Sequence, residues 1–567
     1  VPMLPAARVK LTRGASSALY GPAGNAGVID IVTRAAPTAG VDGVVQLEAG
    51  PDGARRADAR AARRWGIYGL TAAGSYAERD AFSLADGVAE AGAPQDGDRR
   101  LNSDRDDRAL FTSLSATPAR GPRWGVSLNV RGGTRGIPPS VLDPRASDFA
   151  PRARFERVDR DALALHAGLD ALRGAWTLRP TLFLNRDDVV TDGFDDARFA
   201  TQERAGAFRE DAVTRAVGGG LQLTRRAPRT LVTLQLDAPR ARGRAEGVEI
   251  VQMGGGAGGG GGGMGGGGGM GGGAGGGGGG RAVTRPIDEN RTIDQGGVAV
   301  ELEWDAGGPW RAVVGAGYAA QQRPDAADEA DVHGLVGASR ALGDRARLRA
   351  SLARQIRFPT LRDLFATDRG NPSLAPERTR HVELGVDVAS ADGRTRGSLA
   401  LFHVDAEDFI QGVPGGRLEN LARVRRQGVE LSVDRRLGPR TSVRAGYTHL
   451  DAENRAPDAD VTAIQSQPVH TVALSLDHAT SFGLRLRLDA RGVADHVALS
   501  RTRPTRVLAL DDYAVVDLLM TQALRGDRLT LRVRVDNAFD TDIVESIGFP
   551  APGRTFAVGL GIRVDAR

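Results

Sequence analysis

The side chains that most often carry catalysis are sparse in this sequence. The chain has 567 residues, no cysteine and eight histidines, and it holds neither a His-x-x-x-His pair nor a Gly-x-Ser-x-Gly turn. Zinc hydrolases and serine hydrolases use those arrangements to bind a metal or to expose a nucleophile. The residue types therefore favour no catalytic site, no zinc site and no bound cofactor.

Two pairs of neighbouring carboxylates, Asp187-Asp188 and Asp511-Asp512, stand where strand ends or loops are expected. Carboxylate oxygens bind Ca²⁺, so such a pair could assist ligand binding. On the rim of a loop, the same pair is an ordinary solvated charge. Both interpretations stay open at the level of sequence.

A third candidate is the segment Gly254–Gly280, which is almost pure glycine interrupted by Ala257, Met264, Met270 and Ala274. Glycine cannot bury apolar area and loses much backbone entropy on ordering, so a disordered loop tip is expected. Methionine thioethers bind Cu(I). A copper-capturing loop therefore stands beside the simpler interpretation, a slipped glycine repeat with no His or Cys inside it.

The elements that would position such groups are strands. In the segment Leu529–Val535, Leu529 and the apolar residues at every second position share one face, while Thr530, Arg532 and Arg534 share the other. Residues 347–354 and 484–491 repeat this period of two, which is typical of a sheet with one apolar and one polar face. Helical periodicity is scarce, so nothing could cover the apolar face. A membrane barrel leaves that face to lipid.

Connection lengths support a barrel. Short turns are expected at 117–122, 305–309, 342–344, 391–393, 437–439 and 525–527, and long connections near 79–107, 134–151, 187–208, 241–292, 358–377, 408–423, 452–466, 495–510 and 538–553. Outer-membrane barrels place short turns on the periplasmic side and long loops outside. About 22 strands fit between Gly43 and Val564, and the glycine-rich segment then falls in the fifth external loop. Barrels of this size enclose a plugged lumen.

Charge argues against nucleic acid as a partner. The sequence pI is about 10.0, yet the formal net charge is only +5, and Lys10 is the only lysine among 75 Lys and Arg residues. Arginine and aspartate interleave, as in Asp104–Arg108, so no basic face stands apart as nucleic-acid binding requires. We find no apolar run of 18 residues that could form a membrane helix. Val1–Pro5 has no signal-peptide pattern, and a truncated start is expected.

Several motifs occur in the order found in TonB-dependent outer-membrane receptors. The stretch Arg13–Arg34 resembles the closing motif of their plug domain. Farther along, residues 355–365, 370–377 and 383–385 resemble a mid-barrel signature, residues 420–431 the next one, and residues 535–540 and 550–556 the closing signature. The resemblance implies an all-β fold: a 22-stranded antiparallel transmembrane outer-membrane barrel (41–567) with a remnant of the plug at the N-terminus (1–40).

The resemblance also implies residue roles. In the family, the arginine of the plug motif forms buried ion pairs with glutamates of the barrel wall, so Arg13, Glu383 and Glu430 would lock the plug in the lumen. Breaking a buried ion pair by removing one partner typically costs about 3–5 kcal/mol. A lumen charge solvated by water is the alternative. Gly14, Tyr20, Gly21 and Gly27 belong to the plug motif, in which Lys10, Ala15 and Asp30 depart from the family pattern.

The function implied is energy-coupled uptake of a scarce nutrient, such as a ferric siderophore or cobalamin, through the outer membrane of a Gram-negative bacterium. The implied partners are outer-membrane lipid, the energy-coupling protein TonB for the full-length form, a metal chelate or other nutrient ligand, and the barrel-assembly machinery. The end Asp565-Ala-Arg567 departs from the family's closing aromatic residue, which would slow assembly. The family's energy-coupling box is expected to belong to the full-length form, ahead of Val1.

Two other functions remain open. A passive pore or a decayed receptor barrel would have an open lumen and high single-channel conductance. A soluble β-propeller or sandwich would be extracted without detergent. The external loops, rich in Arg, Asp, Gly and Pro, indicate neither a substrate nor ligand-contact residues.

Overall fold

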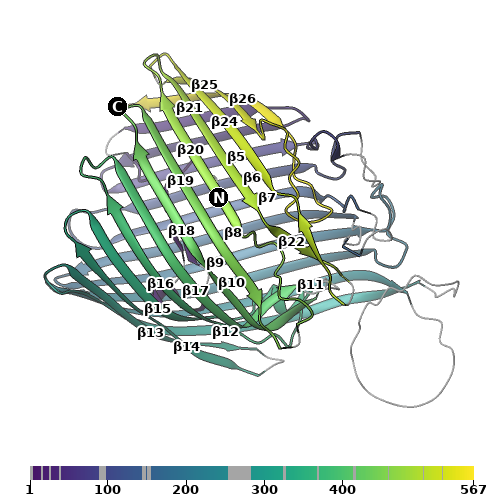
Figure 1. Ribbon diagram of the computed structural model, residues 1–567, viewed down its shortest axis with the longest axis horizontal. Coiled ribbons are helices and arrows are strands. Elements are labelled where there is room, and N and C mark those ends of the chain that lie inside the picture. Colours follow the sequence, from purple (N-terminus) through teal and green to yellow (C-terminus); the bar gives the residue numbers. More distant parts are fainter. Residues whose placement is uncertain are drawn as a thin grey trace.

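The computed structural model describes residues 4–566 except 14–16, 24–26, 38–39, 89–96, 143–147, 150–154, 253–281, 324–326, 367–368, 413–416, 458, 502–503 and 527. The side chains of Arg13, Ala23, Ala422, Asp565 and Ala566 are also outside this description. Within these residues the protein is built almost entirely of strands (Figure 1). None of its described helices is long and apolar enough to cross a membrane.

Twenty-two strands of the described chain form one closed antiparallel barrel. They are β3 (Val41–Ala49), β4 (Arg55–Trp65), β5 (Tyr68–Arg79), β6 (Arg105–Ala116), β7 (Arg123–Ile137), β8 (Phe155–Arg173), β9 (Trp176–Phe194), β10 (Phe208–Arg226), β11 (Thr230–Gln252), β12 (Ala282–Asp305), β13 (Trp310–Gln322), β14 (Glu329–Leu342), β15 (Ala346–Arg357), β16 (Glu377–Ala389), β17 (Thr395–Gly412), β18 (Leu418–Arg436), β19 (Thr441–Asn454), β20 (His470–Ala479), β21 (Leu484–Ala494), β24 (Tyr513–Leu524), β25 (Leu529–Asp536) and β26 (Thr555–Ala566). Each pairs with the next, and β26 closes the ring on β3 with Val558 opposite Ala49. The expected fold class is confirmed.

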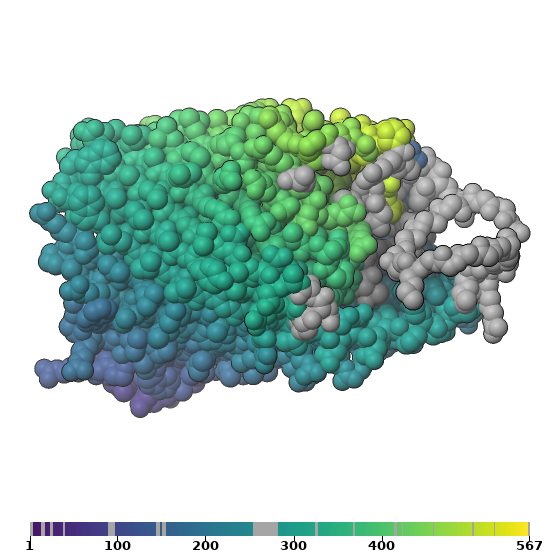
Figure 2. Space-filling model, turned by 90° about the horizontal axis from the view of Figure 1, so that it is seen from below, coloured from purple at the N-terminus to yellow at the C-terminus, as the bar shows by residue number. Residues whose placement is uncertain are grey.

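The two faces of the wall differ as the alternating sequence requires. On β12, Val298, Val300, Leu302 and Trp304 point outward and are 40–49% exposed, whereas Glu301 between them is 7% exposed and points into the lumen. Successive side chains of a strand lie on opposite faces, so the outward face is apolar and suited to lipid. Figure 2 shows the teal and green parts of the chain as one continuous surface on the side in view.

Tryptophan marks one edge of the apolar band. All five tryptophans lie at strand ends next to short turns: Trp65, Trp124, Trp176, Trp304 and Trp310. Aromatic residues concentrate where a barrel crosses from lipid to water. The short-turn end of the barrel therefore lies at the periplasmic interface.

The expected short turns are confirmed over their described residues, which leave out Asp527, but several strands are longer than predicted. Strand β9 continues to Phe194, β11 to Gln252, and β12 begins at Ala282, inside regions predicted to be connections. Their upper parts project above the lipid band, and their outward faces carry mostly polar or charged residues there, so the apolar alternation that marks a strand is missing. The segment Gly254–Gly280 lies outside the described residues; it joins β11 to β12, the fifth connection on the long-loop side.

Six smaller elements complete the described chain. Strands β22 (His496–Leu499) and β23 (Val507–Leu510) pair within an external connection, and α1 (Leu361–Phe365) lies in another. At the N-terminal side, β1 (Ala6–Arg13) and β2 (Gly27–Thr33) form a separate antiparallel hairpin with Val9 opposite Ile31. The 3₁₀ segment η1 (Ala18–Ala23) lies between them. Strand β2 is thus formed by residues of the plug motif.

Candidate functional site in the lumen and the external loops

The η1 segment sits on the inner wall of the barrel. Ser17 Oγ donates a hydrogen bond of 2.6 Å to Glu301 Oε2 on β12. His333 Nε2 on β14 lies 3.0 Å from the carbonyl oxygen of Ala18. A carbonyl can only accept, so Nε2 carries the proton. Ala18, Glu301 and His333 are all buried, which makes this the best-defined contact between the N-terminal segment and the wall.

Two glycines of β13 make room for that contact. A Cβ atom at Gly315 would lie 2.9 Å from Cβ of Ala18, and one at Gly317 would lie 2.4 Å from Nε2 of His333. Glycine in a strand often marks such a close approach of another backbone or group. The pattern Gly315-Ala-Gly317 inside a strand was the available sequence signal, and sequence reasoning missed it.

A second contact fixes the chain between the hairpin and the barrel. Arg64 Nε near the end of β4 donates to the carbonyl oxygen of Pro37 at 3.1 Å. At Gly69, a Cβ atom would lie 3.0 Å from Cβ of Ala36. The segment before β3 is thus held at the periplasmic end, far from the η1 contact in ring order.

Only some of the residues predicted to lock the plug have described side chains. Glu383 on β16 and Glu430 on β18 both face the lumen, since Leu384 and Leu431 beside them are exposed outward. Glu383 forms an ion pair with Arg349 of the wall. The Arg13 side chain and Gly14 lie outside the described residues. The lock stays a prediction.

The other plug-motif residues lie around η1. Gly21 has a φ of +59°, a conformation that favours glycine. Tyr20 is 48% exposed, and Gly27 pairs with Arg13 at the first position of β2. The motif thus forms the turn that contacts the wall.

The mid-barrel signature forms a structured external loop. Arg357 at the end of β15 makes two bonds with Glu377, 2.8 Å from Nε to Oε2 and 3.1 Å from Nη2 to Oε1. Its Nη1 also donates to Asp363 Oδ2 at 3.1 Å. Thr360 and Asp363 form a capping box at the start of α1, which supplies the first turn with partners. The loop therefore enters and leaves the wall through one charged clamp.

An apolar cluster holds this loop against the barrel. Ile293 of β12, Leu364 of α1, Leu374 and Ile410 of β17 are buried together. Arg323, 6% exposed, donates from Nη1 to the carbonyl oxygen of Leu374 at 3.0 Å. The loop between β15 and β16 thus packs onto a wall strand that is three positions away in the ring.

Asn420, in the next signature, connects the same loop to β18. Its Nδ2 donates to the carbonyl oxygens of Ala375 at 3.1 Å and Asp408 at 2.6 Å. Its Oδ1 accepts from the Ala375 N–H at 2.9 Å. One amide therefore satisfies three backbone groups.

The closing signature connects further loops. Asp540 accepts from the N–H groups of Arg554 at 2.6 Å and Asp86 at 3.1 Å. These backbone donors lower the pKa of Asp540. Asn537, buried and with a φ of +49°, exchanges two bonds of 2.8 Å with Thr541. The loop after β25 is therefore ordered by its own signature and fastened to the loop after β5.

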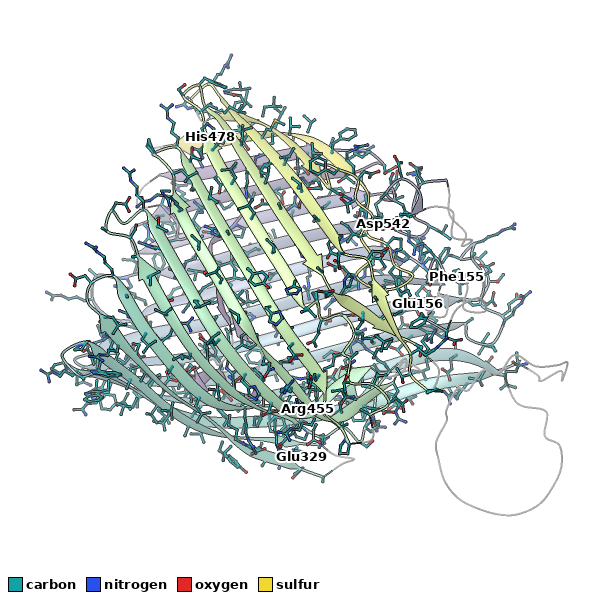
Figure 3. The ribbon with its side chains drawn as sticks, in the orientation of Figure 1. Phe155, Glu156, Glu329, Arg455, His478 and Asp542 are labelled. Carbon is teal, nitrogen blue, oxygen red and sulfur yellow. The ribbon has the colours of Figure 1, made fainter. Side chains whose placement is uncertain are left out.

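One arginine of the loop after β5 is fully enclosed. Arg100 is 1% exposed and donates to the carbonyl oxygen of Pro139 in the loop after β7. Burial lowers its pKa to about 10. Figure 3 shows Asp542 of the loop after β25 and Glu156 at the start of β8 at one end of the barrel, and His478, beside a short turn, at the other. The external loops thus form a connected layer.

The acidic pair Asp187-Asp188 lies within β9 and not in a loop, contrary to its predicted place. Asp187 points inward and pairs with Arg160 at 2.7 Å, whereas Asp188 points outward and pairs with Arg186 at 2.8 Å. Strand alternation separates them, so the two carboxylates cannot share a cation. In the second pair, Asp512 Oδ1 accepts from the Asp495 N–H at 2.9 Å. Among the described residues, no group of three or more His, Asp or Glu could hold a metal ion.

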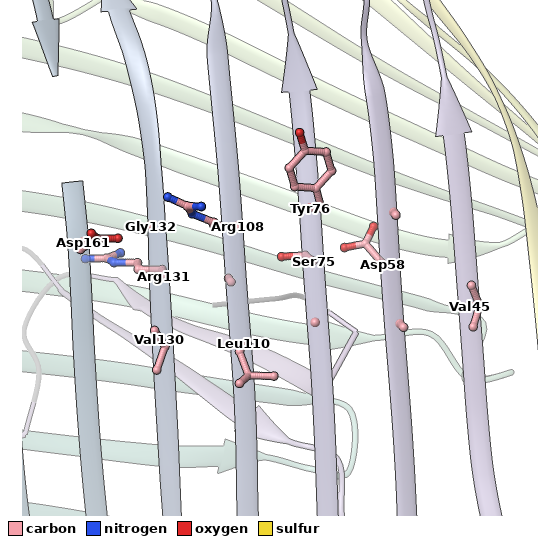
Figure 4. A pocket seen from close by; sticks show the side chains of 14 residues that line it. Val45, Asp58, Ser75, Tyr76, Arg108, Leu110, Val130, Arg131, Gly132 and Asp161 are labelled. Carbon is pink, nitrogen blue, oxygen red and sulfur yellow. The ribbon is translucent and has the colours of Figure 1, made fainter. Parts of the chain in front are cut away.

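A groove of about 480 Å³ lies on the outer wall, over β3 to β8. Figure 4 shows Val45, Tyr76, Leu110 and Val130 around it. All four are exposed and belong to the outward, apolar face of the wall. Its floor is formed by small residues such as Ala59 and Gly74. Because the groove faces lipid and not the lumen, it is no entry site for a nutrient.

Comparison with known proteins agrees with this architecture. A family model described as "TonB dependent receptor-like, beta-barrel" matches residues 92–538, well over half of the chain. The metal-pseudopaline receptor of Pseudomonas aeruginosa is 27% identical over 179 residues, covering 31% of this chain and 25% of that protein. The ferripyoverdine receptor of the same organism is 26% identical over 207 residues, covering 33% and 24%. The matches span about a quarter of these curated relatives.

Solved structures match over nearly the whole chain. The copper transporter OprC has a TM-score of 0.76 at 18% identity, with 99% of this chain and 86% of that chain covered. The FrpB iron transporter from Neisseria meningitidis has a TM-score of 0.76 at 14% identity, covering 100% and 88%. These identities show the fold alone. With the family match, they establish that the chain belongs to the TonB-dependent receptors, as a β-barrel of the Gram-negative outer membrane.

Proposed function

We propose that the protein to which this barrel belongs takes up a scarce nutrient, such as a ferric siderophore or cobalamin, in steps driven by TonB. The matched relatives are named as receptors for metal-pseudopaline and ferripyoverdine, so a metal chelate is favoured as ligand. The family consists of transport receptors, and no enzymatic step is proposed.

The observation that carries this proposal is the hairpin segment seated in the lumen. Ser17 and Ala18 form hydrogen bonds with Glu301 and His333 of the wall. The close approach of Ala18 requires glycine at position 315, because a Cβ atom there would clash with it. A barrel of 22 strands is too wide for wall side chains to fill. A bonded element in such a lumen has to move before a large solute passes.

The predicted lock fits the same mechanism. Arg13, at the end of β1, would pair with Glu383 and Glu430 and hold the hairpin until force is applied. Glu383 is already paired with Arg349, so an added cation there would share one carboxylate between two guanidinium groups. The contact at Ser17 and Ala18 would then fasten the same element a second time, through hydrogen bonds and not through an ion pair.

Uptake assays test the ligand class. The complete protein is expressed in a Gram-negative strain that lacks its own siderophore and cobalamin receptors, and accumulation of radiolabelled ferric siderophores and of labelled cobalamin is measured. We expect accumulation of at least one metal chelate above that of the empty strain. Accumulation of none of these ligands, with the barrel present in the outer membrane, would overturn the proposed ligand class.

Single-channel conductance distinguishes a passive pore from a plugged receptor. The purified protein is inserted into a planar lipid bilayer, and single-channel currents are recorded. A closed channel agrees with a plugged receptor. Large, permanently open channels would support the passive pore instead.

A further inference from the structure

Three arginines form a row across the outer face of the barrel. Arg215 on β10 lies directly opposite Arg186 of β9 and Arg242 of β11. They occupy the same face as Leu182, Val217 and Leu236, which are 66%, 53% and 40% exposed. The pairings run through this region without a shift of register. We call Arg186, Arg215 and Arg242 the arginine row.

The row is short of negative partners. Like charges directly opposite each other destabilise a sheet. Arg186 pairs with Asp188 at 2.8 Å, and Arg242 donates to the neutral amide oxygen of Asn290 at 3.1 Å. Arg215, in the middle, is exposed, and its side chain has no hydrogen bond or ion pair with any residue that the structure describes. By contrast, the adjacent Arg240 and Arg244 are each neutralised, by Asp294 and Glu246.

The height of the row places it at the outer edge of the lipid band. Trp176 marks the periplasmic interface on β9, and Arg186 follows ten residues later on the same strand. At about 3.3 Å per residue and a tilt of about 45°, ten residues rise roughly 23 Å. The apolar band of such barrels is about 25 Å tall. Outward Leu182 and Leu184 fill the last positions below the row.

We propose that the arginine row binds the phosphate of a lipid headgroup in the outer leaflet. Guanidinium groups bind phosphate through parallel hydrogen bonds, and several can share one anion. A phosphorylated lipid anchored in the bilayer would present its headgroup at this height and from this side. The row faces away from the lumen, so the anion it binds is a neighbour of the barrel and not its cargo.

Lipid retention tests the proposal. The folded protein is placed in phosphatidylcholine nanodiscs containing either lipid A, a bisphosphorylated glycolipid, or its dephosphorylated form, and bound lipid is counted by native mass spectrometry. We expect the wild type to retain lipid A in preference. The triple variant Arg186→Gln, Arg215→Gln, Arg242→Gln should bind it at least about tenfold more weakly, and Arg215→Gln alone should give an intermediate loss.

The matched control removes three arginines that face the lumen: Arg347→Gln, Arg396→Gln, Arg485→Gln. It changes the net charge equally and should leave retention unchanged, with folding of all variants checked by heat-dependent gel mobility. Equal retention of both lipid forms, or wild-type retention by the triple variant, would overturn the proposal. Complete displacement by millimolar inorganic phosphate would assign the row to a free anion and contradict the lipid assignment.

Discussion

At the scale of single residues, the contact between η1 and the barrel wall depends on a missing side chain as well as on polar groups. Gly315 offers no side chain where Ala18 approaches, and Glu301 and His333 supply the bonds on either side. Each bond alone contributes on the order of 1 kcal/mol. The seat therefore combines shape with a few polar groups, and it holds the segment without making its release prohibitively costly.

Gly315→Val should displace η1 from the wall. A Cβ there would meet Ala18 at 2.9 Å, and the branched side chain adds two more atoms. We expect a higher single-channel conductance and faster protease cleavage near Ala18, with the barrel still folded. Gly308→Val is the control, because no atom lies within 4 Å of a Cβ at that turn. If both variants match the wild type, the seat does not hold the segment.

Asp540 gives the loop layer a defined response to acid. Its pKa is lowered by the N–H groups of Arg554 and Asp86, so the stabilisation is present above the ordinary aspartate pKa and is lost as pH falls through the lowered value. Amide exchange at Arg554 and Asp86 should therefore accelerate, relative to intrinsic rates, only in strong acid. In Asp540→Asn the protection should not titrate. The same pH dependence in that variant would rule Asp540 out as the cause.

At the scale of elements, prediction from sequence succeeded where one face meets lipid. Strand β25 was expected because apolar and polar residues alternate along it, and it is present as Leu529–Asp536. The upper parts of β9, β11 and β12 carry no outward apolar alternation, so the sequence predicts loops where these strands continue. Helix α1 spans only five residues, too few for a periodic signal. The contact of Ser17 with Glu301 joins residues 284 positions apart, which no local pattern reveals.

Asn420→Ala tests how firmly the loop between β15 and β16 is fastened. The substitution leaves three backbone groups without their partner, and each unpaired buried group costs about 1–3 kcal/mol. We expect faster proteolysis within residues 358–376 and a lower unfolding temperature in detergent. Gln235→Ala, at a half-buried residue of β11 outside this loop whose amide donates to the neighbouring Leu236 carbonyl, should change neither. Unchanged proteolysis in Asn420→Ala would show that the apolar cluster around Leu364 suffices.

At the scale of the whole molecule, the sequence predicted both the barrel and its strand number. The ordered motifs along the chain identified the family. In the structure these motifs hold external loops in place: Arg357 and Glu377 join the two ends of one loop, Asn420 binds the same loop, and Asp540 binds another. What the sequence could not show is where the hairpin meets the wall and where the outer face carries unpaired charge. Both depend on the registers of strands that are distant in sequence.

We propose that transport through this barrel requires mechanical work on the element in its lumen. The direct measurement is accumulation of the labelled nutrient by cells that carry the complete protein, compared between a strain with TonB and an isogenic strain without it. We predict saturable uptake that disappears without TonB, while binding of the nutrient to the cell surface persists. Equal uptake in both strains would contradict the claim, because the solute would then cross a lumen that needs no opening.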